Sequence, residues 1–447
     1  MAGDDSYVTA KFYQPRVERG IFLFSTIEIA KGVSLHIRQS TQFKTVNFSI
    51  KWRKPLTVKD AAERSVLSNV MQHSNGKFKK SADFRSYLDD LYGTVMYFDA
   101  SKRGNDHTVV LNVETVNDQY LAENKVLDDV IDLIQTAIFN PNFENDQFVS
   151  SIVEREKEMI IQRIQSIFDD KTRYAHQRLT QIIRPNHPAS ISANGTIEDV
   201  KNITPESLTK AYHSMINDDK IDIYVLGDVD EKAIQEKLVN ALAFKDREPI
   251  PYPEYEESRP EKDYVNEKQD MNQGKLHIGY SVPVKFGDED YPKMQVFNGV
   301  FGGYAHSKLF MNVRERESLA YYASSSYSSH YGLVYVVSGI EPSNEKKAID
   351  VINEQLDEMK NGNISDLELN QTKAMLGSQL REALDSARGQ IDIYDQYKDY
   401  GEEFSVDTWK ERWAKVTKED LKQMAEQLKL EAVYFLSGKE GSQDANN

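Results

Sequence analysis

Short segments in which apolar and polar residues alternate recur along the chain. They include residues 20–28, 33–37, 45–52, 95–100, 108–114 and 275–282. Such alternation predicts β-strands with one face on a core. Elsewhere Met159, Ile160, Ile164 and Ile167 follow helical spacing, which predicts an amphipathic helix with a buried apolar face. Hairpin-linked strands and helices that occur in blocks favour an α+β fold.

The order of these elements is repeated in the second part of the chain. Thr204, followed by Pro205, is predicted to cap a helix before an apolar strand at residues 221–227. Thr417 is predicted to cap another helix before a strand at residues 432–438. Upstream, a hairpin at residues 95–114 has a counterpart at residues 320–338. Repeats of this length predict duplicated domains rather than a solenoid, whose units span about 20–50 residues.

One stretch, residues 246–274, combines four prolines with many charged residues. This composition is typical of a solvated linker between domains. It predicts an N-terminal domain at residues 1–245 and a C-terminal domain at residues 275–438, with a disordered tail at residues 439–447.

Composition and charge exclude several classes of protein. Apolar residues make up 39% of the 447 residues, which is enough for sizeable cores. The net charge of −16 argues against binding to nucleic acid or an anionic membrane, because such a surface needs a basic excess. The chain has no cysteine, so disulfides and thiolate zinc sites are absent. With no signal-like N-terminal run and no stretch of roughly 20 apolar residues, a cytoplasmic location is expected.

Several short motifs occur in a specific order. Residues 298–310 read NGVFGGYAHSKLF and run directly into MNVRERESLAY at residues 311–321. Upstream lie His187-Pro188, Gly195-Thr196, Thr204-Pro205 and Gly227-Asp228. From about residue 20 to residue 438 this order resembles the pitrilysin/insulinase-like (M16) metallopeptidase family. The resemblance implies two homologous domains of the M16 peptidase/LuxS-like metallohydrolase type, each a mixed sheet backed by helices, arranged as a clamshell.

Active members of that family carry His-x-x-Glu-His on a first-half helix, which holds zinc and the general base, and a later Glu completes the metal site. The resemblance places Ser65, Ser68, Asn69 and Arg163 at those four positions. The degenerate set fits no metal, since a guanidinium cannot ligate zinc. The sequence supports this reading without any alignment, because no two of the nine histidines lie within five residues of each other. We therefore expect no catalytic residue, no metal and no cofactor.

A second-half motif of the family is intact. The resemblance implies that Arg314 and Tyr321 bind substrate, with the guanidinium on a carbonyl or carboxylate and the hydroxyl near charge that develops on the scissile carbonyl. Tyr322 follows directly, so the choice of tyrosine stays open. A structural explanation is also open, because arginine favours helix C-termini and tyrosine favours strands.

These observations favour a non-catalytic M16 homologue that serves as the partner subunit of a zinc-bearing M16 peptidase. We expect a peptide or protein substrate, a hetero-oligomer with the zinc-bearing homologue (a homodimer stays open), and no binding to nucleic acid or membrane. Two alternatives remain, which are a purely structural core-type subunit and a stand-alone peptide-binding protein. An active zinc metallopeptidase is the least favoured reading, although the chain could form half of a two-component enzyme.

Overall fold

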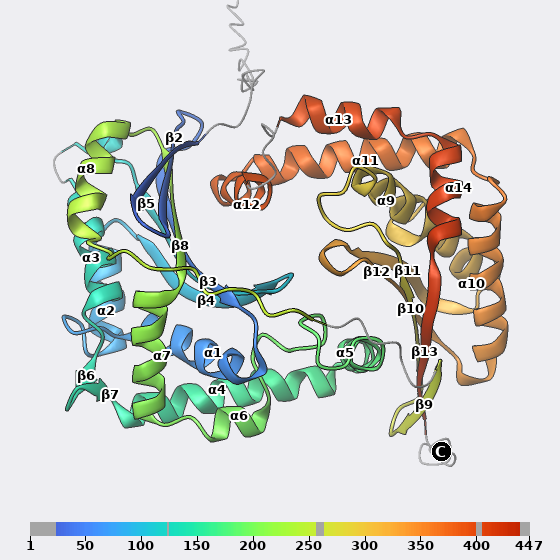
Figure 1. Cartoon of the computed structure of the whole chain (residues 1–447), viewed down its shortest axis with the longest axis horizontal. Helices are drawn as coiled ribbons and strands as arrows, with labels where there is room; N and C mark the ends of the chain where they lie inside the picture. The colour runs from blue at the N-terminus through green and yellow to red at the C-terminus, as the bar shows by residue number, and fades with distance from the viewer. Residues whose placement is uncertain (1–23, 123–124, 256–262, 399–404, 439–447) are drawn as a thin grey trace, which may run out of the picture.

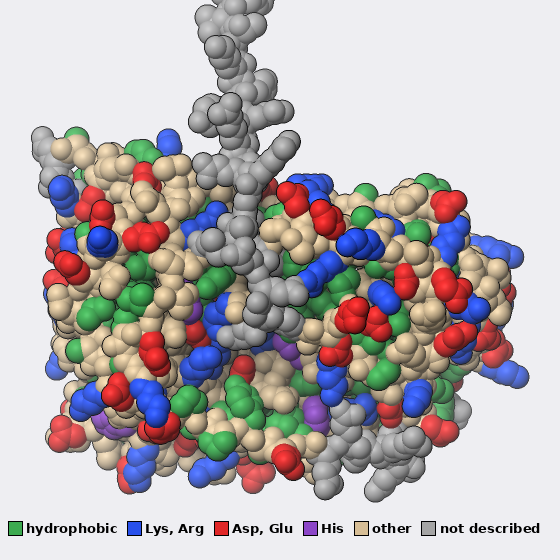
Figure 2. Space-filling view, turned by 45° about the horizontal axis from the view of Figure 1, so that its top comes forward, with side chains coloured by type: hydrophobic (Ala, Val, Ile, Leu, Met, Phe, Trp, Pro, Cys, Tyr) green, Lys and Arg blue, Asp and Glu red, His purple; other side chains and the backbone are tan. Residues whose placement is uncertain are grey.

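The computed structural model describes residues 24–122, 125–255, 263–398 and 405–438, which form two halves side by side (Figure 1). Each half consists of one mixed sheet with helices packed on one of its faces. The predicted α+β class with two homologous domains is confirmed. Charged side chains of both signs are interspersed over both halves on the face shown in Figure 2.

The first half has a six-stranded sheet in the order β1-β2-β8-β3-β5-β4. Its strands are β1 (Ser25–Ala30), β2 (Val33–Gln39), β3 (Thr45–Pro55), β4 (Val95–Arg103), β5 (Asp106–Val116) and β8 (Lys220–Gly227). Its helices are α1 (Val58–His73), α2 (Ser81–Asp90), α3 (Leu127–Phe139), α4 (Ser150–Asp169), α5 (Lys171–Ile183), α6 (Ile197–Lys201), α7 (Pro205–Asp218) and α8 (Glu231–Ala241). A two-stranded ribbon, β6 (Phe143–Glu144) and β7 (Gln147–Phe148), and a 3-10 turn, η1 (Asp118–Tyr120), complete it.

The second half has a five-stranded sheet in the order β11-β12-β10-β13-β9. Its strands are β9 (Tyr264–Gln269), β10 (Gly274–Ser281), β11 (Ala320–Ser328), β12 (Leu333–Ile340) and β13 (Lys429–Gly438). Its α-helices are α9 (Tyr291–Asn298), α10 (Glu345–Lys360), α11 (Asp366–Leu384), α12 (Ala387–Tyr397), α13 (Val406–Lys415) and α14 (Lys418–Gln427). Two π-helical segments, η2 (Gly299–Gly303) and η3 (Leu309–Arg316), and two 3-10 turns, η4 (Ser329–Tyr331) and η5 (Pro342–Asn344), lie between them.

The duplication predicted from the sequence is present in the strand order. Strands β2-β8-β3-β5-β4 of the first sheet correspond to β9-β13-β10-β12-β11 of the second. In both halves the last strand pairs in parallel with one neighbour, as β8 does with β2 and β13 with β9. The predicted caps are also confirmed, since the hydroxyls of Thr204 and Thr417 each accept a bond from a backbone N–H at the third helical position.

The segment expected to be a linker is shorter than predicted. Residues 264–269 form β9, the counterpart of β2, and β10 already begins at residue 274. Every second residue of β9 is exposed, because successive side chains of a strand point to opposite faces of the sheet. A charged, Gln-containing segment can therefore still form an edge strand. The tail at residues 439–447 lies outside the described residues.

Each half contributes one helix to the other half. Helix α5 of the first half packs on β10 and β13, where Ala175, Leu179 and Ile183 join an apolar cluster with second-half strand residues. Helix α12 of the second half packs on β3 and β8 of the first sheet, on the face away from that half's own core. The two helices occupy equivalent places in the duplicated order, so the exchange is reciprocal.

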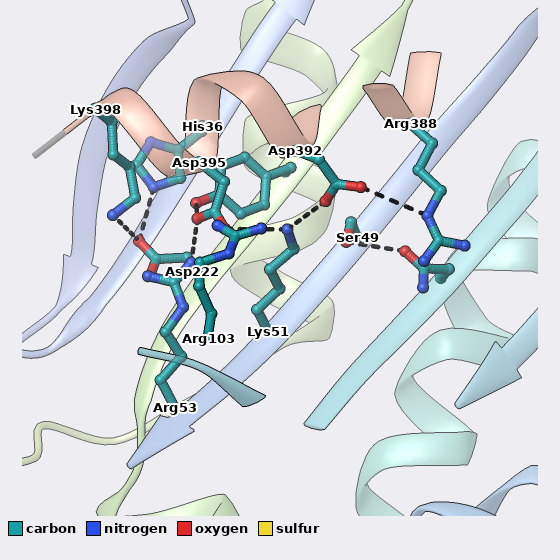
Figure 3. Close-up of polar contacts among 12 residues, drawn as sticks. His36, Ser49, Lys51, Arg53, Arg103, Asp222, Arg388, Asp392, Asp395 and Lys398 are labelled. Carbon is teal, nitrogen blue, oxygen red and sulfur yellow. Dashed lines mark hydrogen bonds and ion pairs between the residues drawn. The ribbon is translucent and has the colours of Figure 1, made fainter. Parts of the chain in front are cut away.

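The contact made by α12 is charged and buried (Figure 3). Asp395, which is 4% exposed, accepts from Lys51 at 3.1 Å, from Arg103 at 3.0 Å, and also from Arg53 and the Tyr224 hydroxyl. Burial alone would raise the pKa of Asp395, but the charges of Lys51 and Arg53 outweigh it and hold the pKa well below its usual range. The carboxylate is therefore ionised and fully partnered between the halves.

Asp222 of β8 extends this cluster beneath α12. Its carboxylate pairs with Arg53 at 3.1 Å, with Lys398 at 3.6 Å and with the His36 imidazole at 3.0 Å. Because the positive groups come from both halves, the cluster joins α12 to the first sheet at several points (Figure 3).

We expect Asp395→Asn to destabilise the chain by about 3–5 kcal/mol, because it removes the buried carboxylate that Lys51, Arg53 and Arg103 share. Asp392→Asn is the matched control on the same helix. Its carboxylate also pairs with Lys51, at 2.8 Å, but the side chain is 42% exposed. The control should cost about 1 kcal/mol or less. Urea unfolding of both variants measures the difference, and equal losses would contradict a central role for Asp395.

Candidate functional site

Three of the residues predicted at the family's zinc positions lie on helix α1, and the two serines among them have hydrogen-bond partners. Ser65 and Ser68 are buried, at 0% and 1% exposure. The Ser65 hydroxyl donates to the side-chain oxygen of Asn194 at 2.8 Å, and the Ser68 hydroxyl donates to the Ser65 carbonyl at 2.8 Å. Asn69 is half-buried on the same helix. The spacing of these three residues places them on one side of α1, and the two serines hold the helix in place through their hydrogen bonds.

An adjacent residue of α1, Arg64, forms the charged centre of this region. Its guanidinium donates to Asp219 at 2.6 Å and to Nδ1 of His107 at 3.0 Å, and all three side chains are buried. Burial, followed by the charge of Arg64, lowers the pKa of His107 to about 3, so the imidazole is neutral. Its Nε2–H then donates to the Ala193 carbonyl at 2.9 Å. Both ring nitrogens are therefore occupied, and His107 is not free to ligate a metal.

Arg163, the fourth degenerate position, lies exposed on α4. Within the part of the chain that the structure describes, no group of three or more His, Asp or Glu side chains could hold a metal ion. The residues predicted at the family's zinc positions are two hydroxyls, an amide and a guanidinium, which do not fit a catalytic zinc ion. We therefore assign no catalytic step to a metal ion at these four positions.

Arg314 of the second-half motif lies on η3 and is partly exposed. Its guanidinium lies 4.6 Å from the centre of the Phe310 ring, and its Nε is 3.7 Å from a carboxylate oxygen of Glu315. The segment η3 packs against β11, and Gly302 of η2 lies so close to β11 that a Cβ there would be 2.5 Å from the Ser325 nitrogen. Close packing of this turn thus fixes η2 and η3 beside β11.

The two tyrosines after Arg314 have different environments. Tyr321 is 60% exposed at a bulge in β11, and its hydroxyl donates to Glu341 at 2.7 Å. Tyr322 is partly buried, and its hydroxyl lies 3.1 Å from the Thr172 hydroxyl of α5. The Tyr322 ring also covers Gly339, where a Cβ would approach within 2.4 Å. Tyr322 therefore bridges the halves, and Tyr321 faces solvent.

The structure brings Arg314 and Tyr321 onto neighbouring elements of one half. Among the residues with described positions, no hydrogen bond, ion pair or ring contact links them to Ser65, Ser68, Asn69 or Arg163. Sequence patterns do not indicate a further feature, a cavity of about 530 Å³ between the halves that is lined by Lys102, His176 and residues of β11 and β12. Lys102 and His176 lie far apart in the sequence and follow no recognisable motif, because only the fold brings their segments together.

Comparison with known proteins establishes the family. The model described as "Peptidase M16 inactive domain" matches residues 202–376. The chain is 39% identical over 414 residues to the "Probable inactive metalloprotease YmfF" of Bacillus subtilis (strain 168), covering 92% of this chain and 97% of that protein. The chain belongs to the M16 peptidase family and is an inactive homologue within it.

Solved structures agree with this assignment. A conserved protein from Enterococcus faecalis V583 has a TM-score of 0.88 and 32% identity, covering 93% of this chain and 99% of that one. A chain of Complex III2 from Candida albicans has a TM-score of 0.68 at 15% identity, covering 93% of this chain and 95% of that one, and shares the fold. Within the described ranges, no helix is long and apolar enough to cross a membrane.

Phenylalanine substitutions separate the two tyrosines. Tyr322→Phe removes the hydroxyl that reaches Thr172, and we expect a loss of about 0.5–1.5 kcal/mol in the free energy of unfolding. Tyr321→Phe removes a solvent-exposed hydroxyl, and we expect no measurable change. Thermal or urea unfolding measures both variants. A larger loss for Tyr321→Phe would contradict the assignment of Tyr322 as the bridging residue.

Proposed function

We propose that this chain is a non-catalytic subunit that pairs with a zinc-bearing M16 homologue and presents Arg314 and Tyr321 to the bound peptide. The observation that carries the proposal is a contrast in exposure. Ser65 and Ser68 of α1, which are predicted at zinc positions of the family, are buried and hydrogen-bonded, whereas Arg314 and Tyr321 remain accessible on neighbouring elements.

The chemistry of the two side chains suits this role. A guanidinium can hold a peptide carbonyl or carboxylate through charge-assisted bonds. A phenol hydroxyl can donate to the oxygen on which negative charge develops during peptide cleavage. In the isolated chain both groups have carboxylate partners at the surface. The Arg314 Nε lies 3.7 Å from a carboxylate oxygen of Glu315, and the Tyr321 hydroxyl donates to Glu341 at 2.7 Å. Exposed contacts of this kind contribute little energy and can be exchanged for a substrate.

The bulge at Tyr321 supports the choice of this tyrosine. The pairing register of β11 with β12 shifts between Ala320 and Tyr322, so the residue between them is turned out of the ladder. Bulges commonly aim a side chain away from a sheet. Tyr322, by contrast, is held between the halves by Thr172 and Gly339 and has a structural role in this proposal.

The experiment is a peptide-cleavage assay on the complex of this chain with a zinc-bearing M16 homologue from the same source, using a quenched fluorescent peptide library. Arg314→Ala should lower kcat/KM by about 10²–10³-fold, because it removes a charge-assisted donor that positions the substrate, without changing the zinc content of the complex. Tyr321→Phe should lower it by a similar factor.

Arg316→Ala is the matched control. Arg316 lies on the same π-helical segment, is 76% exposed, and has only a distant contact of 3.8 Å with Glu317. Equal activity for the Arg314→Ala, Arg316→Ala and wild-type complexes would overturn the substrate role and leave a structural subunit. A chain that forms no complex but binds extended peptides would instead favour a stand-alone peptide-binding protein.

A further inference from the structure

The cavity between the halves is built by segments that are far apart in the sequence. Lys102 at the end of β4, residues of α5 and the loop at residues 189–193 form its first-half wall. The end of β11, Tyr331 and Tyr335 form its second-half wall. Its volume of about 530 Å³ lies within the range of small-ligand sites. A ligand in this cavity would contact both halves at once.

Lys102 is the one charged side chain among the residues that line the cavity, and no carboxylate lines it. The ammonium donates to three backbone carbonyls, of Pro188 at 3.0 Å, Ala189 at 2.8 Å and Ile191 at 2.6 Å. Burial lowers the pKa of Lys102 to about 8, so at neutral pH the group is still mainly protonated. Among the residues that the structure describes, the cavity therefore contains a positive charge that backbone dipoles stabilise and that no lining carboxylate neutralises.

Because Lys102 already donates to three carbonyls, it would attract a ligand through its positive charge and not through a hydrogen bond. Other groups must supply the hydrogen bonds to the ligand. His176, Gln177, Ser326 and Ser328 line the cavity, and their side chains make no hydrogen bond within the described part of the chain. Burial, followed by the charge of Lys102, lowers the pKa of His176, so its neutral ring offers one N–H. Four side chains that can donate hydrogen bonds thus line the same cavity as Lys102, two from each wall.

We infer that this cavity is a binding site for a monocarboxylate ligand. One unit of positive charge balances a carboxylate, whereas a dianionic phosphate would leave negative charge without a partner. Hydroxyl, amide and imidazole donors match the two carboxylate oxygens. The rings of Tyr331 and Tyr335 offer flat apolar surface to the rest of the ligand. The carboxylate can belong to the C-terminus of a peptide or to a small organic acid.

This site does not use Arg314 or Tyr321, and it needs no second subunit. It can therefore be tested on the full chain alone by isothermal titration at pH 7. The probes are N-acetyl-trialanine with a free carboxyl end, the same tripeptide with an amidated end, and butyrate. We expect the free acid to bind at least about tenfold more tightly than the amide, because only the acid makes charge-assisted bonds.

Lys102→Met should weaken binding of the free acid by about tenfold, since it removes the only charge in the lining. This variant also frees the loop at residues 188–191, so a second variant, Ser328→Asp, places a repelling charge on the opposite wall and leaves the loop intact. It should weaken binding by at least the same factor. Lys210→Met, on the exposed surface of α7, removes the same charge outside the cavity and should bind as the wild type does.

If butyrate binds and the free-acid tripeptide does not, the carboxylate comes from a small organic acid and not from a peptide C-terminus. Three results would overturn the inference, namely equal binding of acid and amide, no binding of any probe, or unchanged affinity in both cavity variants. Failure here would leave the proposed subunit function untouched, because the cavity contains neither Arg314 nor Tyr321. For the same reason, Arg314→Ala should retain full binding of the free acid.

Discussion

The structure depends on the docking of a second-half helix onto a charged sheet face of the first half. One face of the first sheet carries Phe48, Ile50 and Trp52 of β3 into the main core. The opposite face carries Lys51 and Arg53, which lie under α12. Buried cations are tolerated only when they are paired, and Asp395 supplies the pairing carboxylate from the other half. The cations on this face of the first sheet are therefore both buried and paired only when α12 packs on it.

The reciprocal contact uses different chemistry. Helix α5 fits onto the second sheet through an apolar cluster that includes Leu179, Ile183 and Leu333. The α12 contact thus combines buried ion pairs with an apolar cluster of Ile391, Tyr224 and Leu226, whereas the α5 contact is mainly apolar, although the duplicated order makes the two helices equivalent. An apolar contact contributes most of the burial energy, and a charged one selects its partner by geometry and sign. This asymmetry gives α5 and α12 distinct docking faces.

Much of the fold could be predicted from the sequence because local patterns decide it. Alternation predicted β2, β3 and β10, and Thr204 and Thr417 predicted two caps. The strand β9 was missed because its charged residues and nearby prolines are typical of a linker. Polar residues on β3 would be expected at a solvated face, and only the placement of α12, far away in the sequence, buries them. Arg314, Tyr321 and the degenerate zinc positions are predictions from the family motif, and the different exposure of Tyr321 and Tyr322 required the three-dimensional contacts.

The residues predicted at the family's zinc positions take part in the packing of α1. Ser65 and Ser68 lie in the interior, and Arg64 binds Asp219 and His107 beside them. A helix that is fastened in this way keeps the fold while having no groups suited to zinc. The most direct test is elemental analysis of zinc per chain, on protein purified without a metal-affinity tag. The account predicts far less than one zinc per chain, and one tightly bound zinc per chain would contradict it.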